Sequence, residues 1–289
     1  MSSKVEKHKV PVLPEPVRLR IYALGKFRQL ITNAAIKKAL KRGDFKIDGE
    51  VATSESFVVG GECIELSCSE STLPKRKLIF PLKVLYEDDY LAVIHKPAGI
   101  LVSGNSFKTI AHALPQNLQL SPLPDATAPQ PVHRLDYATT GCLLVGKTRS
   151  SIQLLNQLFE EKKVAKRYLA VTIGEMEQEG TINLPVDDKP AESYYKVLQS
   201  VFSKRFSRLN LVELQPATGR RHQLRKHLAS IGHPILGDST YCPEELLVKG
   251  KGLYLHAYSL SLTHLATGKQ LEIVDELPAG FMKIFPELA

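Results

Sequence analysis

The chain has 289 residues, of which 43% are hydrophobic, enough for one large domain or for a large and a small one. Its four cysteines include no C-x-x-C pair and its first residues, MSSKVEKHKVP, are charged, so we expect a cytoplasmic protein without a metal cage or a secretion signal. The apolar runs are far shorter than the roughly 20 residues that a bilayer requires, which excludes a membrane-spanning protein.

Positive charge is concentrated near the N-terminus. The chain carries a net charge of +8, and residues 1–50 hold twelve Lys and Arg against five Asp and Glu. A polyanion is the expected partner, because each phosphate that a cation neutralises releases counterions and gains affinity. An anionic membrane surface is the weaker alternative, since this segment has no stripe of Trp or Phe.

The first elements along the chain are small. Residues 1–13 show no periodicity and predict a flexible arm. A helix is expected near residues 31–42, where the apolar positions recur at helical spacing and Gly43 follows as a stop signal. Asp48 and Gly49 then form a tight-turn dipeptide between apolar residues, which predicts a short hairpin.

Three pieces of this region resemble a known module. VRLRIYALGKF, AAIKKALKRGDFKIDGE and VVGGECIEL are similar to the small RNA-binding domain with the αL motif that occurs in a small-subunit ribosomal protein. The resemblance implies an RNA-binding domain over residues 14–68. It implies RNA contacts from the basic residues Arg28, Lys37, Lys38, Lys41 and Arg42. The alternative is a solvated basic helix in a small domain of unrelated purpose.

A linker is expected next, over residues 69–82, because this stretch is rich in Ser, Thr, Pro and basic residues. The larger domain, residues 83–289, opens with two short strands about an acidic turn within VLYEDDYLAVIHKPAG. A proline-rich loop over residues 114–131 follows, and a loop of this length on a strand scaffold often carries function.

The remaining segments alternate between helix and strand. SSIQLLNQLFEEKK predicts a helix with serines available as its cap, and YLAVTI predicts a half-buried strand. LNLVELQP predicts another strand, and TGRRHQLRKHLASIGHP predicts a helix that ends near Gly232, on which Arg221 and Arg225 share one face. LYLHAYSLSLTHLATGKQLEIV predicts two strands about a Thr-Gly turn. The fold class is therefore α+β.

The stretch PVHRLDYATTG sets a carboxylate, Asp136, beside the basic pair His133 and Arg134. Alone, it could be a solvated charge cluster. Together with HKPAG at 95–99, KRYLAVTIG at 166–174 and TGRRHQLRKHLASIGHPILGDSTY at 218–241, it resembles the catalytic domain of RNA pseudouridine synthases of the RluA family. The resemblance covers residues 83–289 and implies a mixed, largely antiparallel sheet flanked by helices.

The resemblance also implies an activity. The chain is expected to be an isomerase that converts uridines of structured RNA to pseudouridine without metal or cofactor, as a monomer. Ribosomal RNA is favoured over transfer RNA, because the appended N-terminal domain occurs mostly in the ribosomal-RNA enzymes of this family. A non-catalytic RNA-binding or ribosome-assembly factor on the same fold is the alternative.

Roles for individual residues follow from the resemblance. Asp136 is the expected nucleophile, attacking the sugar or assisting a glycal intermediate, and Arg225 is its expected salt-bridge partner, since a neighbouring cation favours an ionised carboxylate. Tyr168 is expected to stack on the flipped base and help move the proton from carbon five. From its position next to Asp136, rather than from the resemblance, Arg134 is the candidate for filling the space that the flipped base vacates and for holding phosphate; the alternative is a simple ion pair.

Two other chemistries were considered from the residues. A histidine metal site is not expected, because no H-E-x-x-H occurs and His222 and His227 are five apart. A hydrolase would need a second carboxylate near Asp136; Asp238 of GDSTY is the motif acid available, and the resemblance implies a structural role for it. The chain departs from the family at His95 and Thr140, where Asn and Ser are usual.

Overall fold

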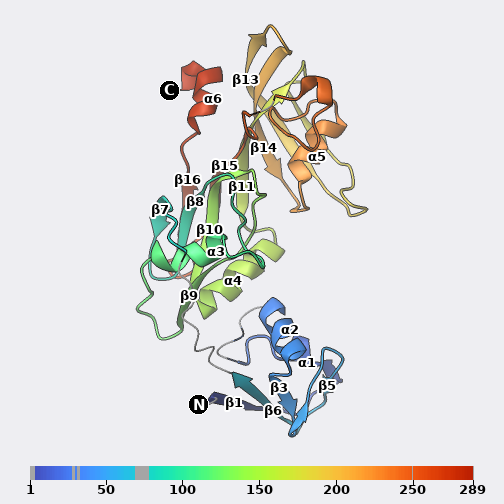
Figure 1. Ribbon diagram of the computed structural model, residues 1–289, viewed down its shortest axis with the longest axis vertical. Coiled ribbons are helices and arrows are strands. Elements are labelled where there is room, and N and C mark those ends of the chain that lie inside the picture. The colour runs from blue at the N-terminus through green and yellow to red at the C-terminus, as the bar shows by residue number, and fades with distance from the viewer. Residues whose placement is uncertain (1–3, 28–29, 31–32, 69–77, 249, 289) are drawn as a thin grey trace. The chain divides into compact units, whose positions relative to one another are not determined.

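The computed structural model describes residues 4–27, 30, 33–68, 78–248 and 250–288 (Figure 1). The chain divides into two compact units, residues 1–76 and 77–289, and the boundary lies within the segment 69–82. Arg28 and residues 69–77 of the expected linker lie outside the described residues. None of the described helices is long and apolar enough to cross a membrane.

The N-terminal unit is a small sheet covered by two helices. Its main sheet has the strand order β1-β6-β3-β4, and a separate pair joins β2 to β5. The strands are β1 (Lys4–Lys9), β2 (Val17–Arg18), β3 (Phe45–Ile47), β4 (Glu50–Val51), β5 (Phe57–Val58) and β6 (Cys63–Cys68), and the helices are α1 (Leu19–Tyr22) and α2 (Asn33–Arg42). Apolar side chains of both helices and of β3 and β6 bury one another, among them Leu19, Ile36, Phe45 and Ile64.

The helix near residues 31–42 and the hairpin at Asp48 and Gly49 are confirmed. Gly43 takes a φ of 75° directly after α2, and Asp48 and Gly49 take φ of 48° and 91° between β3 and β4. Both central turn residues therefore have the left-handed backbone that closes a two-residue hairpin.

Residues 4–9 differ from the expected loose arm. They form β1, which pairs antiparallel with β6 from Lys4↔Cys68 to Lys9↔Cys63. The sequence KVEKHK is almost entirely polar, so no apolar alternation marks it as a strand; its partner lies more than fifty residues away, and long-range backbone pairing defines it.

The C-terminal unit is built on one ten-stranded sheet with the order β12-β13-β14-β11-β15-β10-β8-β7, with β16 pairing β15 and β9 pairing β10. Only β10 and β15 run parallel among its recorded pairs. The strands are β7 (Val84–Glu87), β8 (Leu91–Lys96), β9 (Ala126–Pro131), β10 (Thr140–Thr148), β11 (Ala165–Ile173), β12 (Glu179–Ile182), β13 (Ser193–Ser203), β14 (Ser207–Pro216), β15 (Leu255–Thr263) and β16 (Gln270–Val274). The mixed, largely antiparallel sheet is confirmed.

Helices cover both faces of this sheet. They are α3 (Ile110–Ala113), α4 (Arg149–Glu160), α5 (Gln223–Ser230) and α6 (Ala279–Ile284), with short 3₁₀ turns at Leu114–Gln116, Glu244–Leu246 and Pro286–Leu288. Figure 1 shows α4 beside β10 and α5 beside β14, where they make their contacts. Thr148, rather than a serine, caps α4, with Ser151 completing a capping box.

Two local expectations in this unit were wrong. Strand β11 is buried on both faces rather than one: Leu169 and Val171 pack in one core with α6, and Ala170 packs in another with α5. The helix after β14 begins only at Gln223, so Arg221 lies in the preceding turn and does not share a helical face with Arg225. The error at β11 arose because the alternation of residues along a short strand does not show whether a helix covers its second face.

Candidate active site

Asp136 lies in the loop that joins β9 to β10, at the wall of a cavity of about 560 Å³. Its side chain is 15% exposed. The cavity is also lined by the end of α4, by β11, and by the turn that leads from β14 into α5. Four segments distant in the sequence therefore meet around the cavity that Asp136 lines.

Two basic side chains face Asp136. Arg225 Nη1 lies 3.9 Å from its Oδ2, and His222 Nε2 lies 3.7 Å from its Oδ1. His222 is held at the start of α5 in a left-handed backbone, with a φ of 56°, and its Nδ1 is 2.8 Å from the Tyr241 hydroxyl. Burial lowers the pKa of His222, an effect that Arg225 reinforces and Asp136 opposes. His222 is therefore a neutral polar neighbour at neutral pH, and Arg225 supplies the positive charge.

Asp238 holds Arg225 more closely than Asp136 does. Arg225 Nε and Nη2 each donate to an Asp238 carboxylate oxygen at 2.7 Å, and the backbone N–H groups of Thr240 and Tyr241 donate to Asp238 as well. Burial alone would raise the pKa of Asp238, but the hydrogen bonds from Arg225 and Thr240 hold it below its usual range. Asp238 is thus an ionised clamp that fixes the guanidinium.

This clamp decides against Asp238 as an acid catalyst. Asp238 is 1% exposed, and both of its oxygens accept hydrogen bonds. A general acid must carry a proton at working pH and reach the leaving group. Asp238 does neither, so the two-carboxylate hydrolase arrangement is not formed by Asp136 and Asp238.

Tyr168 and Arg134 line the same cavity as Asp136. Burial and the charge of Asp136 raise the pKa of Tyr168 above its usual value, so its phenol is protonated at neutral pH. The Tyr168 oxygen can therefore accept a proton from a substrate carbon only if the phenol gives up its own proton. Arg134 is exposed, and no carboxylate among the described residues pairs with it within ion-pair distance, which leaves its guanidinium available to an anion.

Lys96 supports the Asp136 loop from beneath. Its side chain is fully buried, and Nζ donates to the backbone oxygens of Pro97, Tyr137 and Thr139 at 3.0, 3.2 and 2.9 Å. Burial lowers the pKa of Lys96 to about 8, although the charge of Asp136 opposes the shift. Lys96 is therefore a buried cation that ties together the backbone on the C-terminal side of the carboxylate.

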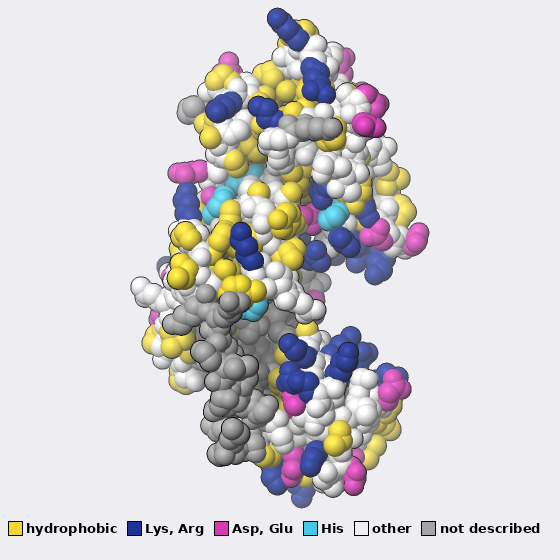
Figure 2. Space-filling view, viewed as in Figure 1, with side chains coloured by type: hydrophobic (Ala, Val, Ile, Leu, Met, Phe, Trp, Pro, Cys, Tyr) yellow, Lys and Arg dark blue, Asp and Glu magenta, His cyan; other side chains and the backbone are white. Residues whose placement is uncertain are grey.

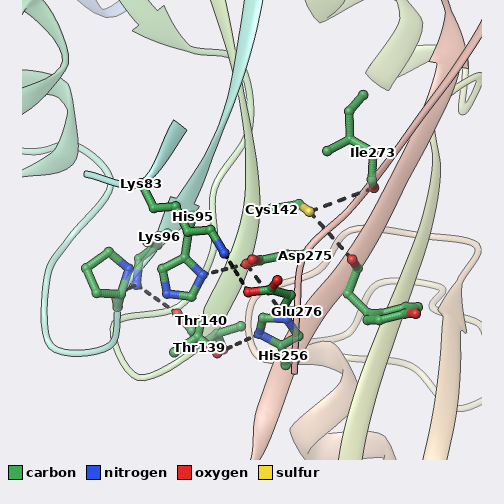
Figure 3. Close-up of polar contacts among 12 residues, drawn as sticks. Lys83, His95, Lys96, Thr139, Thr140, Cys142, His256, Ile273, Asp275 and Glu276 are labelled. Carbon is green, nitrogen blue, oxygen red and sulfur yellow. Dashed lines mark hydrogen bonds and ion pairs between the residues drawn. The ribbon is translucent and has the colours of Figure 1, made fainter. Parts of the chain in front are cut away.

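A polar network continues behind this loop (Figure 3). Thr140 Oγ1 lies 2.8 Å from His256 Nδ1, and His95 Nδ1 lies 2.5 Å from Asp275 Oδ2. Burial lowers the pKa of His256 to about 4 despite Asp275, so the ring is neutral. His95 and Thr140, the two positions that depart from the family pattern, are thus polar supports outside the cavity lining.

Close backbone packing fixes the start of β10. A Cβ on Gly141, whose φ is 114°, would lie 2.3 Å from the backbone oxygen of Ala257 on the parallel strand β15. Only glycine permits both this φ and this approach. The geometry of the loop that carries Asp136 is consequently set on its C-terminal side, by Gly141 and by the hydrogen bonds from Lys96.

Within the described residues, no group of three or more His, Cys, Asp or Glu side chains could hold a metal ion. His133 accepts a hydrogen bond from Leu144 N at 2.9 Å and stacks on Phe159, and burial lowers its pKa to about 3. It is a neutral scaffold residue.

Comparison with known proteins gives the site its context. Residues 90–230, which include Asp136, Tyr168 and Arg225, match the family model described as RNA pseudouridylate synthase. Ribosomal large subunit pseudouridine synthase D of Nitrosomonas europaea is 36% identical over 260 residues, covering 80% of this chain and 73% of that protein. The chain belongs to the RluA-type RNA pseudouridine synthases.

Two further relatives of these synthases extend the likeness. Ribosomal large subunit pseudouridine synthase C of Rickettsia prowazekii is 32% identical, covering 94% of this chain and 97% of that protein. The solved structure of human RNA pseudouridylate synthase domain containing 4 is 29% identical, with a TM-score of 0.57, covering 71% of this chain and 92% of that one. The isomerase class of this synthase rests on these matches.

The structure brings together the expected catalytic-domain residues Asp136, Tyr168, Arg225 and Arg134. In the N-terminal unit, Lys37, Lys38, Lys41 and Arg42 are exposed, and Figure 2 shows Lys and Arg side chains gathered over α1 and α2. Arg42 is ion-paired with Asp44. The sequence did not predict that Lys96 binds the Asp136 loop or that His222 faces Asp136, and it gave Asp238 only a general structural role. All three residues lie within the recognised motifs, which is the signal that could have drawn attention to them.

Lys96 gives a prediction that combines activity with pH. Replacing Lys96 by Met keeps the aliphatic stem but leaves the Thr139 oxygen without its donor, and we expect a roughly 10- to 100-fold loss of turnover. Above about pH 8 the folded protein has released the Lys96 proton, whereas the unfolded chain holds it to about 10.5. Wild-type stability relative to Lys96→Met should therefore rise between these pH values.

Urea unfolding of both proteins at pH 7 and pH 10.5, with tritium release from uracil carbon five as the activity readout, tests this expectation. Lys83→Met is the matched control, because Lys83 is exposed and pairs with Glu276 outside the cavity. A constant difference in unfolding free energy across the two pH values would show that Lys96 is not the buried cation described.

Proposed function

We propose that the enzyme isomerises specific uridines of structured ribosomal RNA to pseudouridine, with Asp136 as the nucleophile. The observation that carries the proposal is the Asp136 carboxylate at the cavity wall, faced by Arg225 and His222, with the protonated phenol of Tyr168 in the same cavity. The curated relatives named for ribosomal large-subunit RNA support the choice of ribosomal over transfer RNA. An RNA substrate also supports the expected cytoplasmic location.

This reaction needs only one reacting carboxylate. The uracil is detached, rotated and rejoined through carbon five, so the leaving group stays bound and no water has to be activated. Asp136 either attacks the sugar or assists a glycal intermediate, and Arg225 favours its ionised form. Tyr168 stacks on the flipped uracil and exchanges a proton at carbon five through its hydroxyl.

The uridine has to leave its stack before it reaches Asp136. Base flipping costs a few kcal/mol, which contacts elsewhere must offset. Arg134, exposed on the cavity rim and without a carboxylate partner among the described residues, fits the role of filling the vacated space and holding phosphate. In this proposal, Arg134 stabilises the RNA with the uridine flipped out, and Asp136 reacts with that uridine.

Tritium release from RNA labelled at uracil carbon five tests the function directly. We expect the wild-type enzyme, acting as a monomer, to release tritium from ribosomal RNA and far less from transfer RNA. Tritium release from transfer RNA alone would contradict ribosomal RNA as the substrate and identify transfer RNA instead. Tight binding to ribosomal RNA with no release from either RNA would favour the assembly-factor alternative.

We propose further that the RNA-binding domain expected over residues 14–68, within the N-terminal unit, binds RNA through the exposed face of α2. Its exposed cations Lys37, Lys38 and Lys41 support this role. Changing these three lysines to Gln should weaken RNA binding about 10- to 100-fold near physiological salt. The slope of log Kd against log salt should fall by about 2 to 3, because each lost phosphate contact removes roughly 0.7 to 0.9 from it.

Filter binding over a range of salt concentrations measures both effects, and kcat at saturating RNA should stay near wild type. The matched control changes three exposed lysines of the other unit, Lys189, Lys196 and Lys204, to Gln. An equal loss of affinity in both triple variants would mean that only the net charge of the protein matters and that α2 is not the binding surface.

A further inference from the structure

A second cavity lies beside the one that holds Asp136. Its volume is about 480 Å³, against about 560 Å³ for the first, and both lie within the range of sites for small molecules. The two share lining residues at the end of α4, the start of β11 and the end of β14: Phe159, Lys162, Lys166, Pro216 and Ala217. The cavities therefore have a common wall.

That wall carries two cations without counterions. Lys162 is exposed, in a left-handed turn with a φ of 58° just after α4, and Lys166 is half-buried on β11. Burial lowers the pKa of Lys166, and the charge of Lys162 lowers it further. Within the described residues, neither lysine has an ion pair, in contrast to Lys163 between them, which pairs with Glu161.

Two like charges placed together and partly desolvated are unfavourable unless an anion joins them. The far part of the second cavity is not strongly basic, because its Arg167 already pairs with Glu213 and Glu272. Within the second cavity, the cations that have no carboxylate partner among the described residues thus lie at its boundary with the first cavity. An RNA strand has one phosphate between each pair of neighbouring nucleotides. In the same way, the two lysines lie between two cavities, each of which could hold one nucleotide.

We propose that Lys162 and Lys166 bind the phosphodiester that joins the target uridine to its neighbour in the same RNA strand, and that the second cavity receives this neighbouring nucleotide. The inference rests on the proposed function. Phe159 and Tyr194, which line the second cavity, offer aromatic surface to its base, and stacking of this kind is tolerant of base identity. The second cavity and its two lysines therefore bind the RNA backbone and contribute little to sequence specificity.

Neutral phosphate analogues test this site without altering the protein. Short RNA substrates are made with a single methylphosphonate at each position around the target uridine, and kcat/KM and Kd are measured for each. We expect a loss of about 10- to 100-fold in kcat/KM at one phosphate adjacent to the target. Wild-type enzyme that is active but indifferent to both adjacent phosphates would overturn the inference while leaving the proposed function intact.

Lys162→Asn with Lys166→Met completes a double-mutant cycle. Asn tolerates the left-handed turn, and Met keeps the aliphatic stem of a half-buried lysine. The double variant should lose a similar factor on ordinary RNA and lose no more on the sensitive methylphosphonate RNA. The same factor lost on both RNAs would mean that the lysines act elsewhere.

Lys163→Met is the matched control, since it removes the same charge from the same turn but lines neither cavity. It should stay within about twofold of wild type on every RNA. Wild-type enzyme that releases no tritium from any RNA would contradict the proposed function itself. In that case, the Kd series alone decides whether the paired lysines hold a phosphate.

Discussion

Replacing Asp136 by Asn is expected to abolish tritium release, with a fall of at least about 10⁴-fold, while RNA binding stays within about threefold of wild type. Asn keeps the size of the side chain but has no negative charge and is a poor nucleophile. The two groups that face it, the Arg225 cation and the neutral ring of His222, are unaltered. The loss therefore falls on the chemical step and not on recognition.

The control for this substitution is Asp89→Asn, which removes one exposed carboxylate from the turn between β7 and β8. It should be as active as wild type. Chromatography of the digested RNA adds a second readout, because a wild-type product of free uracil in place of pseudouridine would make the protein a hydrolase. Residual release by Asp136→Asn within about tenfold of wild type would falsify the nucleophile assignment.

Local pattern accounts for much of the fold. The spacing of Ile36, Ala39 and Leu40 predicts α2, and the turn residues Asp48 and Gly49 predict its hairpin, because these signals depend on neighbours in the chain. Strand β1 could not be found in this way. It exists through pairing with β6, and its own residues are mostly polar.

The site shows the same division between local and long-range information. Asp136, Tyr168 and Arg225 could be nominated because each sits in a recognisable motif. The loop acceptors of Lys96 could not be predicted, since the Tyr137 and Thr139 oxygens lie 41 and 43 positions further along the chain. His222 approaches Asp136 only because its backbone is left-handed where the helix had been expected to run, and periodicity carries no such information.

The clamp on Arg225 was also beyond sequence reasoning, which paired this arginine with Asp136 alone. In the structure, Arg225 is 3.9 Å from Asp136 but donates twice to Asp238 at 2.7 Å. A guanidinium held in this way presents one nitrogen to Asp136 at a longer distance. It supplies positive charge and leaves the carboxylate oxygens free of a close ion pair, which a nucleophile requires.

Replacing Asp238 by Asn is accordingly expected to destabilise the protein by about 3 to 5 kcal/mol, because it leaves Arg225 buried without its close counterion. Tritium release should fall steeply as well, since the freed guanidinium can close on Asp136 and occupy its oxygens. The Asn oxygen still accepts from the Thr240 and Tyr241 N–H groups, so the turn itself is preserved. Urea unfolding and tritium release measure the two effects.

Coupling between the two side chains separates this role from a general loss of structure. Replacing Arg225 by Met leaves Asp238 buried without its cation, so adding Asp238→Asn to that variant should recover most of the stability lost by either single change. Activity should remain low in the double variant, because Asp136 then lacks the charge that favours its ionised form. Additive losses of stability would instead mean that Asp238 supports its turn independently of Arg225, and the clamp would have no part in setting the nucleophile.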